Sequence, residues 1–282
     1  MRPIPRPTFS VKEVFTTSIS RIRDPDLKAR LEGCLNEIII DSDIYDTKAT
    51  NATLHQISKK THINVNVTKD EMNKVYTDRM VNKKGPGRNF YEKLRYPNGF
   101  DKCPLCGHLP IKTLDHYLAK TDHPSLAVSP NNLVPACNDC NQIKNAATPT
   151  CSEEETLHPY FDDIDDEQWL FARVVQTTPV SFNFFIQPPE NAPDLLAKRV
   201  KYHFELYKLN RLYKSEAATE ISDITYQLKS LLNKAGPIAV KKHLSEMAIS
   251  CLESRKNSWK TAMYEALSND SWFCNHGISM QS

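Results

Sequence analysis

The sequence predicts an α+β protein that is mostly helical, with a small zinc-stapled module of a hairpin and a helix inserted between helical N- and C-terminal regions. Three observations support this prediction. Apolar residues recur at helical spacing on both sides of the chain's centre, two Cys-x-x-Cys pairs stand close together in the middle, and β-rich segments follow them. We expect a helical region with a proline-rich arm over residues 1–85, the zinc module over 86–150, and a β-hairpin plus helical region over 151–282.

The N-terminal region begins with prolines and continues with helix start signals. Residues 2–7 favour an extended polyproline conformation, as either a disordered tail or a docking arm for a partner. Ser10-Val11-Lys12-Glu13 has the form of a capping box, and Asp24-Pro25 places proline at a first helical position. Apolar residues then fall on one helical face at Leu27, Leu31, Cys34, Leu35 and Ile38.

A third helix is predicted to begin at a second capping box, Thr68-Lys69-Asp70-Glu71, and to run to about Met80. Gly85-Pro86-Gly87 ends it. A short helix carrying Phe90, Tyr91 and Leu94 then leads into the cysteine-rich module.

The C-terminal region should open with a β-hairpin and continue as helices. The hairpin pairs residues 169–175 with 180–186. One helix is expected over 195–214, and a second to about 232, stopped near Gly236-Pro237. A last long helix is indicated by an apolar stripe typical of core packing: Leu244, Met247, Ala248, Cys251, Leu252, Trp259, Met263 and Leu267.

The composition indicates a globular protein of the cytoplasm. The 282 residues are 40% hydrophobic and 25% charged, and no run approaches the roughly 18 apolar residues of a membrane helix. The first residues have no apolar core, so we expect no secretory signal. Four of the eight cysteines form pairs, as in metal binding in a reducing compartment. We therefore expect a cytoplasmic protein with no membrane partner.

Charge is distributed unevenly along the chain, although the net charge is only +2. Residues 79–95 and 196–214 each hold six Lys or Arg against one acidic residue, whereas 151–168 hold eight acidic residues and no Lys or Arg. The basic stretches would supply phosphate contacts for a nucleic acid, or else form solvated helix faces. Both readings stay open from sequence alone.

The central cysteines predict a structural zinc site. Cys103 and Cys106 form one pair and Cys137 and Cys140 the other. Four thiolates suit tetrahedral zinc, and because such a site is closed, the zinc itself should not activate water.

Polar residues between and after the pairs indicate catalysis. Asp115 and His116 follow an apolar segment, as if they ended a short strand, and Asn141 directly follows the second pair. If zinc brings these segments together, Asp115 and Asn141 can supply oxygen ligands to Mg²⁺ or Mn²⁺. His116 can then take a proton from water that attacks a phosphate, with Asn132 orienting its imidazole.

These residues resemble a known family. The segments Cys-Pro-Leu-Cys-Gly, Leu-Asp-His-Tyr, Pro-Asn-Asn-Leu and Cys-Asn-Asp-Cys-Asn-Gln-Ile-Lys look like an HNH endonuclease with its ββα-metal fold. The resemblance implies that His116 is the general base, that Asp115 and Asn141 bind the catalytic ion, and that Asn132, or Asn131 in its place, is the middle asparagine. Asn141 stands where many members have histidine, and its amide oxygen still suits Mg²⁺ or Mn²⁺.

A looser resemblance extends over Tyr76 to Tyr91 and over residues 157–162. It is to the HNH nuclease that works with an ATPase in Septu-type and retron-linked anti-phage defence systems, and it implies an ATPase partner. DNA phosphates would be met by basic residues within and beside the module, namely Lys84, Arg88, Lys120 and Lys144.

We therefore expect a metal-dependent HNH endonuclease that hydrolyses DNA. Two alternatives remain: an HNH-type nuclease acting on RNA such as tRNA, and a zinc ribbon that binds nucleic acid without catalysis.

Overall fold

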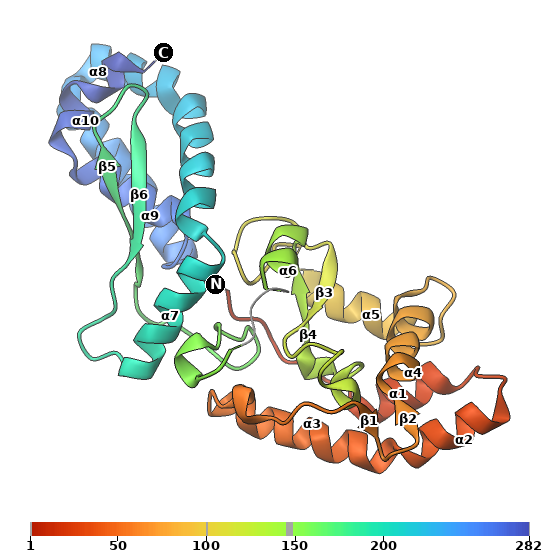
Figure 1. Cartoon of the computed structure of the whole chain (residues 1–282). Coiled ribbons are helices and arrows are strands. Elements are labelled where there is room, and N and C mark those ends of the chain that lie inside the picture. The colour runs from red at the N-terminus through yellow and green to blue at the C-terminus, as the bar shows by residue number, and fades with distance from the viewer. Residues whose placement is uncertain (1, 100, 145–148, 282) are drawn as a thin grey trace. The chain divides into compact units, whose positions relative to one another are not determined.

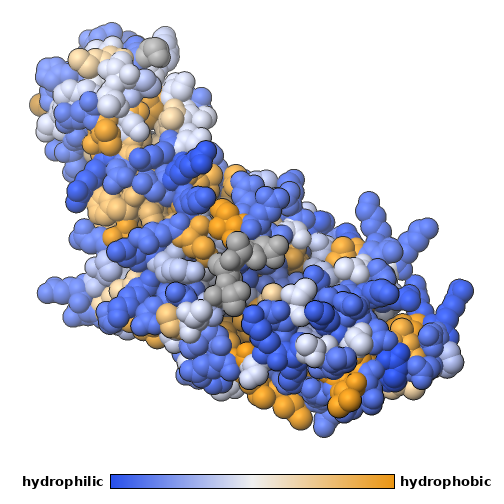
Figure 2. Space-filling model, viewed as in Figure 1, coloured by the Kyte–Doolittle hydropathy of each residue, from blue (hydrophilic) through white to orange (hydrophobic). Residues whose placement is uncertain are grey.

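The protein is mostly helical with small two-stranded sheets, as the sequence predicts. The computed structural model describes residues 2–99, 101–144 and 149–281. The chain forms two compact units, Met1–Asp162 and Asp163–Ser282 (Figure 1). Within the described residues, no helix has the length and apolarity needed to span a bilayer. The visible face in Figure 2 is largely hydrophilic, with apolar residues scattered across it.

The first unit combines helices with two short hairpins. Its α-helices are α1 (Val11–Ile19), α2 (Pro25–Gly33), α3 (Leu35–Thr50), α4 (Lys69–Lys74), α5 (Arg88–Arg95) and α6 (Asn138–Lys144). Its strands are β1 (His62–Ile63), β2 (Val67–Thr68), β3 (Thr113–His116) and β4 (Leu133–Ala136). Shorter helical turns are η1 (Leu54–Gln56), η2 (Val75–Val81), η3 (Pro97–Gly99), η4 (Pro124–Leu126), η5 (Pro130–Asn132) and η6 (Ser152–Glu154).

The helix starts predicted in this unit are confirmed. Ser10 and Glu13 form a reciprocal capping box at the start of α1. Asp24 caps α2, with Pro25 at its first position. The single apolar face predicted around Cys34 is divided between α2 and α3, which meet at that residue.

One hydrophobic core joins the N-terminal helices to the strands of the cysteine-rich segment. Residues of α1, α3, η2 and α5 are buried together with Leu114 of β3 and Leu133 of β4. The predicted boundary near residue 85 therefore lies inside one packed unit. Packing fixes the β3–β4 hairpin on a helical base, which positions the residues at the end of β3.

The helix predicted to run from Thr68 to Met80 changes its geometry midway. The α-helical part, α4, ends at Lys74, and Val75–Val81 continue as the π-helix η2. Gly85 and Gly87 then pack so closely on the end of η2 that a Cβ at either position would lie within 3.2 Å of the Arg79 carbonyl oxygen. The chain needs glycine here to turn back against η2.

Glu71, in the first turn of α4, links this helix to α2 through Arg30. Its carboxylate accepts hydrogen bonds from the backbone and hydroxyl of Thr68, and Arg30 Nη2 donates to it over 2.8 Å. These contacts, the Arg30 hydrogen bond foremost, lower the pKa of Glu71 to about 2. The stabilisation is therefore complete above the ordinary pKa of a glutamate and is lost as the pH falls toward 2.

Glu71→Gln should lower the free energy of unfolding by about 1–2 kcal/mol at pH 7, because the pair and the cap both depend on the charge. Denaturant unfolding of wild type and variant at pH 7, 5 and 3 measures the difference. It should shrink toward pH 3, and a difference that grows with acid would contradict this assignment. Glu32→Gln is a matched control, since the Glu32 carboxylate is exposed and lies 3.9 Å from Lys28.

The N-terminal arm packs on its own chain. The backbone N–H of Arg2 donates to the Pro104 carbonyl over 2.7 Å, and that of Ile4 donates to Pro159 over 2.9 Å. The Arg6 guanidinium lies 3.8 Å from the centre of the Phe161 ring. The alternative of a disordered tail is therefore wrong for these residues, and the arm braces the loop that carries the first cysteine pair.

The second unit contains a long hairpin and a helical layer. Its elements are β5 (Leu170–Val175), β6 (Ser181–Ile186), α7 (Asp194–Leu206), α8 (Leu209–Ser254), α9 (Trp259–Asn269), α10 (Ser271–Asn275) and η7 (Gly277–Met280). The predicted hairpin is confirmed, with Leu170 opposite Ile186 and Val175 opposite Ser181. Helix α9 packs on β5 and α8 packs on β6 (Figure 1).

Two helix boundaries in this unit differ from the prediction. The helix expected over 195–214 is interrupted at Lys208, which has a left-handed conformation with φ of 51° between α7 and α8. The expected last helix is also divided, because α8 ends at Ser254 and α9 begins at Trp259. Between them, Asn257 Oδ1 accepts hydrogen bonds from the first residues of the hairpin, which a continuous helix would prevent. The predicted break at Gly236 is confirmed as a kink within α8.

Candidate zinc centre and active-site pocket

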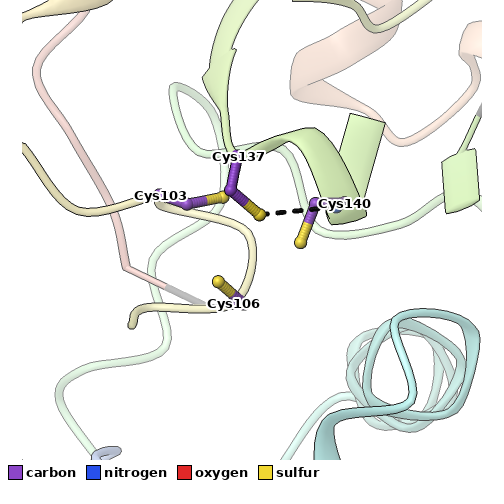
Figure 3. A group of neighbouring side chains, drawn as sticks. All are labelled: Cys103, Cys106, Cys137 and Cys140. Carbon is purple, nitrogen blue, oxygen red and sulfur yellow. Dashed lines mark hydrogen bonds between the residues drawn. The ribbon is translucent and has the colours of Figure 1, made fainter. Parts of the chain in front are cut away.

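The four paired cysteines form a buried cluster suited to zinc. The sulfur atoms of Cys103, Cys106, Cys137 and Cys140 all lie within 4.8 Å of one another, and Figure 3 shows them pointing toward one another. Tetrahedral zinc with Zn–S bonds of about 2.3 Å would separate its sulfurs by about 3.8 Å. The cluster therefore matches the predicted structural site.

Backbone hydrogen bonds to sulfur support this assignment. The N–H of Leu109 donates to Cys106 Sγ, and the N–H of Cys140 donates to Cys137 Sγ, each over 3.4 Å. Such donors stabilise thiolate charge and orient metal ligands. Gly107 has φ of +68°, a conformation that glycine adopts readily, so the chain can turn directly after the first pair.

The cysteine cluster lies where the β3–β4 hairpin passes into α6. Lys112 N–H donates to the Ala136 carbonyl just before β3, and Cys137 directly follows β4. The next residue, Asn138, begins α6, which packs against β3. Tying the two cysteine pairs together thus holds α6 beside the strand that ends in Asp115 and His116.

One pocket brings three of the four predicted catalytic residues together, and Asn132 does not line it. It has a volume of about 400 Å³, and its walls include Asp115, His116 and Asn141. Lys120 and Lys144 also line it. The end of β3 and the helix α6 therefore supply side chains to a single space, as the cysteine spacing predicts.

Asp115 has an unsatisfied oxygen in this pocket. The side chain is buried, and its Oδ2 accepts no hydrogen bond among the described residues. Lys144 Nζ lies 3.4 Å from it. Burial raises the pKa of Asp115, and the charge of Lys144 opposes that rise. The Lys144 ammonium therefore compensates the buried charge only in part, since Oδ2 accepts no hydrogen bond from the described residues, and a bound metal cation would coordinate this oxygen directly.

Lys144 also fixes the strand end. Its Nζ donates to the carbonyl oxygens of His116 over 2.9 Å and Tyr117 over 2.7 Å. The ammonium lies 5.2 Å from the centre of the Tyr117 ring. Lys144 thus holds α6 and β3 together from the pocket side. Its ammonium group is predicted from the sequence to contact a phosphate, but it already donates two hydrogen bonds to the backbone.

The imidazole of His116 is oriented by a backbone carbonyl. Its Nε2 lies 2.8 Å from the Ala127 oxygen, so Nε2 carries the hydrogen and Nδ1 keeps its lone pair. Burial lowers the pKa of His116 to about 3, the hydrogen bond to Ala127 opposes the shift, and Lys120 and Lys144 add to it. The imidazole is therefore neutral near pH 7.

Asn132 acts on the loop and not on the imidazole, so the expected hydrogen bond to His116 is corrected. Its Oδ1 accepts from Leu118 N–H over 2.7 Å, and its Nδ2 donates to the carbonyl oxygens of Leu118 and Leu126. Both amide hydrogens are used in this way. Since Ala127 follows Leu126, Asn132 positions His116 indirectly by shaping the loop that presents the Ala127 carbonyl.

The neighbouring asparagines differ in their surroundings. Asn131, the predicted substitute for Asn132, donates to both carboxylate oxygens of Asp46 on α3. Asn141 lies on α6, half-buried at the pocket wall, and no hydrogen bond holds its side chain among the described residues. Asn141 is thus the amide placed to face a ligand in the pocket.

The basic residues predicted to meet DNA divide into two groups. Lys120 lines the pocket, with its Nζ 6.0 Å from the centre of the Tyr76 ring. Lys84 is exposed on the turn after η2. Arg88, in contrast, directs its guanidinium to Glu92 and the Val81 carbonyl, so its donors already have partners.

Tyr76 has no role predicted from the sequence, yet its side chain lies against the candidate base. Its ring meets that of His116 edge-on, with centroids 4.5 Å apart and planes at 72°. Tyr76 belongs to the π-helix η2, and π-helical turns occur often at functional sites. The sequence offered no signal for this turn, because a capping box predicts an α-helix.

Comparison with known proteins gives one informative relative. The chain is 31% identical over 233 residues to "Protein ea31" of Escherichia phage lambda, and the match covers 78% of each chain. No family model matches the sequence. No solved structure matches it either.

Proposed function

We propose that this chain, which belongs to the family of protein ea31 of Escherichia phage lambda, is a metal-dependent HNH endonuclease that hydrolyses DNA. The observation that supports this most is that one pocket holds both a buried Asp115 oxygen that accepts no hydrogen bond within the described part of the chain and a His116 imidazole oriented by a backbone carbonyl. The zinc-clipped hairpin and α6 would then be its ββα-metal module.

The pocket residues fit a hard divalent cation. Asp115 offers a carboxylate oxygen without a hydrogen bond, and Asn141 offers an amide on the adjoining helix. Mg²⁺ and Mn²⁺ prefer such oxygen ligands, whereas the thiolate cluster suits zinc. When bound, the cation would supply positive charge that stabilises the transition state of phosphodiester hydrolysis.

The chain's own residues would perform the proton transfer. Nδ1 of His116 accepts the proton of the attacking water, while Nε2–H stays bonded to Ala127 and fixes the tautomer. The negative charge of a bound phosphodiester raises the pKa of His116, which makes the imidazole a stronger base once substrate is present. Tyr76 limits rotation of the ring, and Lys120 meets the phosphate from the pocket wall.

The ligand roles are tested by Mn²⁺ binding, measured from the electron paramagnetic resonance signal of free Mn²⁺. We expect Asp115→Asn to weaken binding at least about tenfold, since it removes the charge and keeps the shape, and Asn141→Ala to weaken it less. Cleavage of plasmid DNA should fall in parallel. Wild-type affinity in Asp115→Asn would contradict the ligand assignment.

Asp122→Asn is the matched control. Asp122 lines the same pocket, but its carboxylate pairs with Lys59 over 2.7 Å. Mn²⁺ affinity and cleavage should stay close to wild type. An equal loss in Asp122→Asn would show that general pocket charge, and not a ligand pair, attracts the ion.

The substrate is tested by digesting duplex DNA, single-stranded DNA and total RNA side by side with Mg²⁺ or Mn²⁺. Cleavage of DNA supports the proposal, and cleavage restricted to RNA favours the RNase alternative. Nucleic-acid binding without cleavage of any substrate favours the zinc-ribbon alternative.

The ATPase partner and the anti-phage role complete the proposal and rest on the resemblance of residues 76–91 and 157–162. Purification of the tagged chain from its natural host should recover an ATPase. Phage protection by this chain expressed alone would contradict a required partner.

A further inference from the structure

A groove in the second unit shares no residue with the candidate active-site pocket. It has a volume of about 540 Å³ and is bounded by β6, α7 and the start of α8. The course of these three elements can be followed in Figure 1. The left-handed turn at Lys208 separates the two helices beside it. The groove includes much of the second basic stretch, to which the proposed chemistry assigns no role.

Cations dominate the rim of this groove. Lys208 and Arg211 are exposed, and neither forms an ion pair among the described residues. Lys201 is also exposed and lies 4.0 Å from Glu205, the acidic residue of the lining. The second unit as a whole has 14 Lys or Arg and 14 Asp or Glu, so three cations against one acid is a local concentration of positive charge.

One half-exposed aromatic ring, Phe204, lies among these cations, and a second, Phe185, is already stacked within the hairpin. Along β6, Phe182 and Phe184 are buried, and Phe185 projects to the opposite face of the hairpin, where it is half-exposed. There it stacks on Phe171 across the hairpin at 6.1 Å, with Arg173 4.7 Å from its centre. Phe204 belongs to α7 and lines the groove.

The two asparagines of the groove help to hold its walls together. Asn210 Oδ1 accepts from the Phe184 N–H over 3.0 Å, and its Nδ2 donates to Asn183 Oδ1 over 3.0 Å. They hold the start of α8 against β6. The residues of the groove that could contact a ligand most strongly are therefore its cations and the half-exposed ring of Phe204.

We propose that this groove binds a single-stranded polynucleotide, independently of base sequence. The half-exposed ring of Phe204 accepts an unstacked base, and the flanking cations meet the phosphates. A duplex keeps its bases stacked and would use the cations alone. The inference rests on the proposed nuclease function, since the groove would hold a strand of the nucleic acid on which the first unit acts.

Fluorescence anisotropy tests this with full-length His116→Ala protein, labelled single-stranded DNA, single-stranded RNA and duplex DNA. Phe204→Leu, which keeps apolar volume but removes the ring, should weaken single-strand binding about fivefold or more. Lys208→Gln with Arg211→Gln should also weaken it and lower the slope of log affinity against log salt by about 1.4. Dependence in the DNA arm, the RNA arm or both supports the groove and identifies the polynucleotide.

Lys241→Gln with Lys242→Gln is the matched control, because both lysines are exposed on α8 outside the groove. Single-strand affinity unchanged by the groove variants overturns the proposal. So does a charge effect that is equal for duplex and single strands and unaffected by Phe204→Leu. Binding is measured in a variant without the candidate base. If the groove variants bind single strands normally while the wild-type chain cleaves DNA, only the groove proposal fails. If binding depends on the groove and the wild-type chain cleaves nothing, only the proposed nuclease function fails.

Discussion

His116→Ala should reduce DNA hydrolysis by about 10²–10⁴-fold, because the variant has no group to take the proton from the attacking water. The effect should appear in the cleavage rate at saturating metal. The alanine removes a half-buried ring that contacts Tyr76, and the fold rests mainly on the core beneath β3. Zinc content and the thermal unfolding midpoint should therefore stay close to wild type. The measurement is a time course of plasmid cleavage with Mg²⁺ or Mn²⁺.

His62→Ala provides the matched control for that experiment. His62 is an exposed histidine on β1 of the same unit, outside the pocket lining. It should cleave DNA at the wild-type rate. If His116→Ala cuts as fast as His62→Ala, the imidazole is not the base and the proposed mechanism is wrong.

Patterns of local chemistry were readable from the sequence. Ser10 and Glu13 each accept a hydrogen bond from the other's backbone N–H within four positions of the chain. The spacing of the two Cys-x-x-Cys pairs predicts a four-sulfur metal site by itself. Asp115 and His116 at a strand end followed from the apolar residues before them. Each of these signals is contained in a few adjacent residues, so no knowledge of distant packing is needed to interpret it.

The features that escaped prediction depend on residues far apart in the chain. His116 is oriented by the Ala127 carbonyl, and any residue type can supply a carbonyl, so no side-chain pattern marks it. The helix breaks at Lys208, and this break lets α8 pack on β6. The expected last helix is divided at Asn257, whose side chain accepts a hydrogen bond from the backbone at the start of the hairpin. Local propensity favours helix throughout these segments, and tertiary contacts override it.

Cys137→Ser should remove zinc from the first unit and unfold the segment that carries Asp115 and His116. A structural zinc site contributes about 10–16 kcal/mol of apparent binding free energy, comparable with the whole stability of a domain. Elemental analysis should show a fall from about one zinc per chain, and limited proteolysis should newly cut between residues 101 and 144. Cys151→Ser is the control, since Cys151 is half-exposed and outside the cluster. Full zinc content and wild-type protease resistance in Cys137→Ser would mean that packing alone holds the hairpin against α6. The active-site geometry would then not depend on the metal.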